Sequence, residues 1–187
     1  MDSIFANKAA NAAAGAEEYR RAMLAVIEKR DPLEILEELP HALDELTRGI
    51  PRDVLRRPEA EGKWSVTQVM QHLADTELVW GNRYRMVMAE DHPAIVGYDQ
   101  DLWATNLHYE EVELEDALKQ LLTLREANLR LLRRASPETL ARIGEHSERG
   151  PESLDLMTRM VAAHDIVHRR QMARVLAAVG EKQEPAG

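Results

Sequence analysis

Residues 63–88, KWSVTQVMQHLADTELVWGNRYRMVM, carry the signal that decides the fold. Apolar side chains recur in this stretch at spacings of three and four, which is the period of an amphipathic α-helix. Ser65 and Gln68 have the spacing of a capping box, in which each side chain bonds the other residue's backbone N–H. We therefore predict a long helix that begins at Val66, directly after this cap.

Three further helices follow from the same periodicity. One begins at Asp31-Pro32, a cap followed by a proline at the first helical position. Another spans about residues 114–134, and the last runs from about residue 153 to a stop at Gly180. Four long amphipathic helices, with about 25 residues between the second and the third, predict an all-α protein. The expected architecture is a four-helix bundle with a long crossover connection.

Composition limits the classes of function. The 187 residues are 44% apolar and 30% charged, which suits a soluble chain with one domain over residues 31–187 and a peripheral N-terminal helical extension over residues 1–30. We find no membrane span and no signal peptide pattern, so we expect a cytoplasmic protein without a membrane partner. A net charge of −9 argues against nucleic acid as a partner. The absence of cysteine excludes disulfides and thiolate metal ligands.

Two histidines fall on the apolar stripe of the last helix. His164 and His168 are four residues apart, so both imidazoles occupy one helix face and point into the bundle. This is the geometry in which one helix donates two nitrogens to a metal ion. The same spacing also fits two core histidines that are satisfied by hydrogen bonds, and the pair alone does not choose between these interpretations.

A third histidine favours the metal. His72 lies at the edge of the apolar stripe of the helix that follows Ser65, and from there it can reach an ion between the helices. Three neutral imidazoles leave at least one coordination position open for water or substrate, which is typical of catalytic sites. The same helical periodicity predicts that the side chains of Asp75 and Asp165 point toward solvent. We expect four other histidines in loops or at the surface, namely His41, His92, His108 and His146.

Two charged residues also occupy apolar helix faces. Glu77 lies on the core stripe of one predicted helix, and Arg125 lies on the core stripe of the next. A buried charge without a partner is strongly destabilising, so the two side chains should face one interior, either in contact or bridged through the site. They are candidate catalytic or substrate-binding residues. A purely structural ion pair explains them equally well.

Three segments together resemble the DinB-like superfamily, in particular its YfiT branch of metal-dependent hydrolases. The segments are KWSVTQVMQHLADTE at 63–77, PAIVGYDQDLWA at 93–104 and HDIVHRRQ at 164–171. The resemblance covers about residues 31–180. It implies a four-helix bundle, often a homodimer, in which three histidines bind zinc or nickel, and these correspond to His72, His164 and His168. It also implies relatives that transfer low-molecular-weight thiols such as bacillithiol to electrophiles.

The expected activity follows from such a centre. A divalent ion held by imidazoles makes a nucleophile at neutral pH, because it lowers the pKa of bound water toward ~7 or holds a thiol as its thiolate. The resemblance favours an S-transferase that joins a thiol cosubstrate to an electrophilic small molecule. One alternative is a metal-dependent hydrolase that uses water, and another is a non-catalytic metal or ligand binding module. The connection with Tyr98, Trp103 and Tyr109 either closes over the bundle mouth or packs as an ordinary loop.

Overall fold

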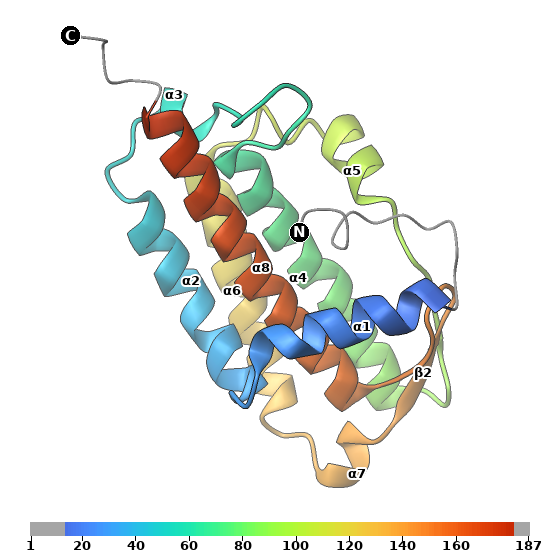
Figure 1. Ribbon diagram of the computed structural model, residues 1–187. Helices are drawn as coiled ribbons and strands as arrows, with labels where there is room; N and C mark the ends of the chain where they lie inside the picture. Colours follow the sequence, from blue (N-terminus) through green and yellow to red (C-terminus); the bar gives the residue numbers. More distant parts are fainter. Residues whose placement is uncertain (1–13, 182–187) are drawn as a thin grey trace, which may run out of the picture.

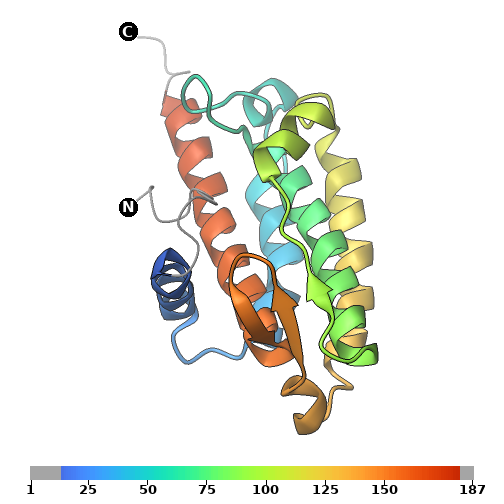
Figure 2. The ribbon, with the colours of Figure 1, turned by 90° about the vertical axis from the view of Figure 1, so that its right-hand side faces the viewer.

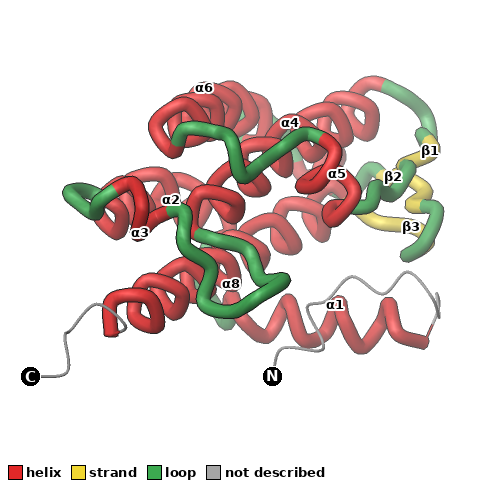
Figure 3. Tube along the Cα trace, turned by 90° about the horizontal axis from the view of Figure 1, so that it is seen from above, coloured by secondary structure: helices red, strands yellow, loops and turns green. Residues whose placement is uncertain are grey.

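The computed structural model describes residues 14–181, and the four-helix bundle accounts for most of them (Figure 1). The bundle helices are α2 (Pro32–Thr47), α4 (Val66–Ala89), α6 (Leu114–Leu132) and α8 (Leu154–Glu181). Both α2 and α4 pack against α6 and α8, so α2 and α4 lie at opposite corners when the bundle is seen from above (Figure 3). The predicted all-α bundle is confirmed.

The connections explain how the chain builds this arrangement. α4 and α6 run in the same direction, so the chain returns along the bundle between them (Figure 2). Residues 90–113 make this return, which is the predicted long crossover. Short elements lie in the connections, namely α3 (Arg52–Leu55), β1 (Ala94–Ile95), α5 (Gln100–Asn106), α7 (Pro137–Leu140), β2 (Ile143–His146) and β3 (Gly150–Ser153).

A small sheet at one end of the bundle was not predicted. β2 and β3 form an antiparallel hairpin, and β1 adds to β2 in parallel, with Ile95 opposite His146. Gly144 permits this packing, because a Cβ atom built there would lie 2.8 Å from Cγ2 of Val87 and 2.9 Å from Cγ1 of Ile95. Strands of two to four residues are too short to show the alternation that identifies a strand in a sequence.

The predicted helix starts are confirmed, and one predicted end is wrong. The Asp31 side chain accepts a hydrogen bond from the Leu33 N–H (2.8 Å), and Ser65 and Gln68 form both bonds of the capping box. Gly180 does not end α8, which continues to Glu181. Glycine lowers helix stability but is compatible with helical φ and ψ, so a helix whose preceding residues are well packed can continue past a glycine.

The first described helix, α1 (Ala14–Ile27), crosses α8 (Figure 1). Its side chains Met23 and Ile27 are buried in the same core as residues of α4 and α8. The expected extension over residues 1–30 falls partly outside the described residues, and the division at residue 31 stays a prediction. Within residues 14–181 no helix is long and apolar enough to cross a membrane.

Candidate metal centre

The three predicted ligand histidines meet between α4 and α8. Nε2 of His72 and Nε2 of His164 lie 3.1 Å apart, and one ring nitrogen from each of the three residues, His168 included, lies within 4.8 Å of the others. Two nitrogens at about 2.0–2.1 Å from one tetrahedral ion are about 3.3–3.4 Å apart, so this spacing suits a zinc-sized ion. The structure thus brings together all three residues that the sequence predicted.

Gln171 fixes the orientation of one imidazole. Its Oε1 lies 2.7 Å from Nδ1 of His168. An amide oxygen only accepts hydrogen bonds, so Nδ1 of His168 carries the proton and Nε2 keeps a free lone pair. Ligand histidines in metal sites are commonly held in this way through their second nitrogen. Gln171 belongs to the segment HDIVHRRQ that resembles the family, but the sequence did not predict a role for it at the site.

All three imidazoles are neutral at pH 7. Burial lowers the pKa of His72 well below its usual value, and His168 lowers it further. Burial also lowers the pKa of His164, with smaller contributions from His168, His72 and Arg125. Burial brings the pKa of His168 to about 4, although its bond to Gln171 acts in the opposite direction. Neutral imidazole is the form that binds metal ions.

The alternative of ordinary core histidines requires that their hydrogen bonds be satisfied. Nδ1 of His72 and Nδ1 of His164 are buried and have no partner within the described chain. Trp64 covers one side of the centre, with its ring centroid 5.1 Å from that of His72. His164 and His168 remain partly exposed, so small molecules in solvent can reach the centre. This access from solvent fits a ligand site better than a packed core.

Arg125 binds two carboxylates in the centre of the bundle. Its Nη2 lies 2.9 Å from Oε1 of Glu77, which confirms that the two predicted charges face one interior. Its Nη1 lies 2.7 Å from Oδ2 of Asp165 and also donates to the Leu36 carbonyl oxygen (2.7 Å). Oε2 of Glu77 accepts a hydrogen bond from the amide of Asn128 (2.9 Å). The four charged and amide side chains are at most 3% exposed.

Three residues expected at the surface are buried instead. Asp165 is held by Arg125, and Asp75 accepts hydrogen bonds from the Tyr109 hydroxyl (2.6 Å) and from the amide of Gln120 (2.9 Å). His146 is 3% exposed in β2. The periodicity of a single helix cannot predict these contacts, because the groups that cover the three residues come from α6, from the crossover and from the small sheet.

The sequence matches the family profile of the DinB superfamily over residues 35–172. The chain belongs to the DinB superfamily. A protein of Oceanobacillus iheyensis named "Putative metal-dependent hydrolase" is 29% identical over 133 residues, which cover 71% of this chain and 77% of that relative. A Bacillus cereus protein of the same name is 27% identical over 133 residues, 71% of this chain and 76% of its own.

A solved structure shares this fold. YfiT from Bacillus subtilis is described as "a probable metal-dependent hydrolase with an unusual four-helix bundle topology". The two structures match with a TM-score of 0.69 at 23% sequence identity, covering 84% of this chain and 87% of YfiT. The predicted resemblance to the YfiT branch is therefore confirmed at the level of fold.

The crossover of this DinB-superfamily chain packs on α4 between the histidines and the small sheet. The Tyr98 hydroxyl lies 3.5 Å from the hydroxyl of Thr76, and Tyr109 binds Asp75. The Trp103 ring lies 4.6 Å from the Tyr98 ring. Thr76 is four residues after His72, so the crossover lies one helical turn from the centre. That it shapes a substrate pocket stays a prediction.

Proposed function

We propose that this chain is a metal-dependent enzyme in which His72, His164 and His168 hold a divalent ion, zinc or nickel. The observation that carries the proposal is the meeting of three neutral imidazoles in a partly open site. The printed names of the relatives, which call them metal-dependent hydrolases, support an enzyme. A second group of suitable donors, His108, Glu110 and Glu111, lies exposed on the surface and has no comparable support.

The reaction is the attack of a nucleophile on an electrophilic small molecule. When bound, a divalent ion lowers the pKa of a water or a thiol and supplies the nucleophile at neutral pH. Gln171 keeps the lone pair of His168 directed at the centre, and Trp64 excludes solvent from one side. The partly exposed side of His164 and His168 is where substrate enters.

Two nucleophiles remain candidates, and the surroundings of the centre favour a thiol. Water, with a pKa of about 15.7, is the weaker acid and gains more from a general base than a thiol with a pKa of about 8.5. Three buried carboxylates lie on α4 and α8, and each is already bonded to other groups: Asp75 to Tyr109, and Glu77 and Asp165 to Arg125. None of them makes a hydrogen bond to a histidine of the centre within the described residues. We therefore favour transfer of a low-molecular-weight thiol, with hydrolysis as the second candidate.

Two assays test this proposal. Protein purified without a histidine tag should contain close to one zinc or nickel per chain by elemental analysis. The metal-loaded protein should then join a small thiol to an electrophile such as 1-chloro-2,4-dinitrobenzene, measured against a panel of esters and amides. Turnover of the esters without thiol would favour the hydrolase. Bound metal without turnover on either panel would favour the non-catalytic binding module, and protein without metal would contradict the proposal.

Three further expectations belong to the same proposal. Its expected ligands are a small-molecule substrate and a thiol cosubstrate, whereas the charge of −9 disfavours nucleic acid. The homodimer implied by the resemblance is tested by the mass of the protein in solution. The cytoplasmic location is tested by fractionation of cells that produce the protein.

A further inference from the structure

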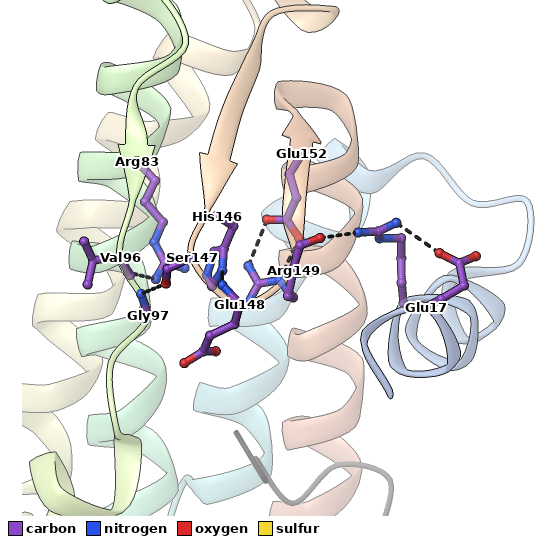
Figure 4. Close-up of polar contacts among 10 residues, drawn as sticks. Glu17, Arg83, Val96, Gly97, His146, Ser147, Glu148, Arg149 and Glu152 are labelled. Carbon is purple, nitrogen blue, oxygen red and sulfur yellow. Dashed lines mark hydrogen bonds and ion pairs between the residues drawn. The ribbon is translucent and has the colours of Figure 1, made fainter. Parts of the chain in front are cut away.

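Arg83 of α4 is a buried cation that forms no ion pair with a carboxylate among residues 14–181. It is 5% exposed, and its Nη2 donates to the Val96 carbonyl oxygen at 2.8 Å (Figure 4). Its guanidinium carbon lies 4.9 Å from the centroid of the Trp80 ring. A cation–π contact and one carbonyl are weak compensation for a desolvated charge, which normally requires an anion. Burial and the charge of Arg149 accordingly lower the pKa of Arg83.

A second guanidinium lies against the same tryptophan. The guanidinium carbon of Arg149 is 5.9 Å from the Trp80 centroid, and Arg149 binds both oxygens of Glu152, at 2.6 and 2.8 Å. Figure 4 shows this pair beside the hairpin, with Glu148 directed away from it. Glu148 lies over Gly97, where an added Cβ would be 2.7 Å from Oε1. Glu152 and Glu148 both lie within electrostatic reach of Arg83, but neither forms an ion pair with it among residues 14–181.

His146 adds a third donor to this cluster. Its Nδ1 accepts the backbone N–H of Glu148 at 3.1 Å, so the neutral ring carries its proton on Nε2. That Nε2 is buried and has no partner within the described chain. Burial, and then the charges of Arg149 and Arg83, lower the pKa of His146 to about 4, which keeps the ring neutral and places both guanidiniums within electrostatic reach of it. A buried N–H without an acceptor, close to a buried guanidinium that forms no ion pair, indicates that an anionic acceptor is missing.

We infer that Arg83, Arg149 and His146 form a binding site for the carboxylate of a small organic acid. Planar guanidiniums bind carboxylates through paired hydrogen bonds, and the imidazole N–H can supply a further one. The side chain of Arg149 is 18% exposed, which gives a ligand access from solvent.

The position of the cluster connects it with the histidines. Arg83 is eleven residues after His72 on α4, which is close to three full turns, so both residues lie on the same face about 16 Å apart along the axis. An extended substrate can therefore hold its acid group at Arg83 and its reacting group at the histidines. This second statement rests on the proposed function, whereas binding of the acid does not.

The first test measures anion binding by thermal unfolding. Sodium acetate and sodium succinate should raise the Tm of the wild-type protein saturably, relative to sodium chloride at equal ionic strength. Arg83→Met should weaken this response at least tenfold without lowering the Tm in chloride, because it removes a buried charge that forms no ion pair and keeps an apolar side chain against Trp80. Arg130→Met, an exposed arginine on α6, should bind as wild type does. An equal response in R83M and wild type would overturn the inference, as would tighter binding of inorganic phosphate than of either carboxylate.

A second measurement does not depend on the variant. In wild-type protein labelled with ¹⁵N, the Nε2–H resonance of His146 should shift saturably when succinate is added, with the same apparent Kd as the thermal response. A resonance that does not move would overturn the inference even when R83M fails to fold.

The two proposals fail separately. If R83M raises KM for acidic substrates and leaves kcat and neutral substrates unchanged, the acid site serves the enzyme. Anion binding in a protein without turnover leaves the acid site standing and contradicts the proposed function. Turnover in a protein that binds neither carboxylate overturns the inference alone.

Discussion

Nη1 of Arg125 lies 2.7 Å from Oδ2 of Asp165, so a side chain of α6 reaches α8 through the centre of the bundle. The same guanidinium binds Glu77 of α4 and the Leu36 carbonyl oxygen of α2. One residue therefore joins its own helix to the other three. Burial raises the pKa of Asp165 to about 7 even though Arg125 opposes this, and Glu77 adds to the rise.

Replacement of the central cation should strongly destabilise the fold. Arg125→Met leaves Glu77 and Asp165 without a counter-charge in a buried site, so we expect the free energy of unfolding to fall by about 3–5 kcal/mol. Urea denaturation measures this loss. The matched control is Arg130→Met, which removes an exposed pair with Glu126 and should change stability by less than about 1 kcal/mol. Similar losses in the two variants would contradict a structural role for Arg125.

A substitution at Glu77 separates its two candidate roles. Glu77→Gln keeps the shape but presents an amide N–H where the Asn128 amide now donates, so we expect a loss of about 1–3 kcal/mol in stability. Metal content and turnover per folded molecule should stay as in wild type, since the bonds of Glu77 go to Arg125 and Asn128. A lower kcat with unchanged stability would show instead that Glu77 acts in catalysis.

Each ligand histidine should be required for metal binding. Alanine in place of His72, His164 or His168 should lower the affinity for zinc at least tenfold, while the far-UV circular dichroism stays helical. Competition with a chromogenic chelator measures the affinity. His41→Ala, which changes an exposed histidine, is the control and should bind zinc like wild type. Unchanged zinc affinity in all three ligand variants would contradict the proposed metal centre.

The hydrogen bond from His168 to Gln171 should tune the centre. Gln171→Leu removes the acceptor, and we expect a loss of zinc affinity of about 10–100-fold. Gln171→Glu keeps an acceptor and adds negative charge, so it should bind zinc at least as tightly as wild type. Equal losses in both variants would indicate that Gln171 matters only for packing.

Acid should destabilise the metal-free protein. His168 has a pKa of about 4 in the folded chain and about 6.5 when unfolded, so between these values the unfolded chain binds more protons. The free energy of unfolding should therefore fall as the pH drops from 6.5 to 4, by on the order of 3 kcal/mol from this residue. Urea denaturation between pH 7.5 and 4.5 checks the slope. His168→Asn should make the slope shallower, with His72, His164 and His146 supplying the rest, whereas an unchanged slope would show that His168 is not buried in the neutral form.

The predictions from sequence succeeded where one helix determines the outcome. The spacing of His164 and His168, the cap at Ser65 and the apolar stripes are local, so periodicity alone placed them. The contact between Glu77 and Arg125, which lie on separate helices, could also be predicted. A buried charge without a partner is destabilising, so two opposite charges on apolar faces should meet.

Apart from the helix end at Gly180, the failures involve groups that meet across elements. Asp165 was assigned to solvent because only its own helix was considered, although Arg125 reaches it from α6. Asp75 is covered by Tyr109, which lies thirty-four residues away in the crossover. The burial of His146 depends on a sheet whose strands are too short to recognise in the sequence. The periodicity within a single helix gives no information on neighbours that come from other elements.

α8 follows the other three bundle helices in the sequence, and this order determines when the bundle can fold. α8 is a neighbour of both α2 and α4, and it supplies Asp165 together with two of the three imidazoles. During synthesis, which proceeds from the N-terminus, α2 and α4 therefore expose apolar faces until the last helix has emerged from the ribosome. A nascent chain or a prematurely terminated product lacks both the central ion pairs and the metal ligands, so it presents a substrate for chaperones and proteases. We therefore expect stable structure and metal affinity to be acquired together, once α8 has emerged.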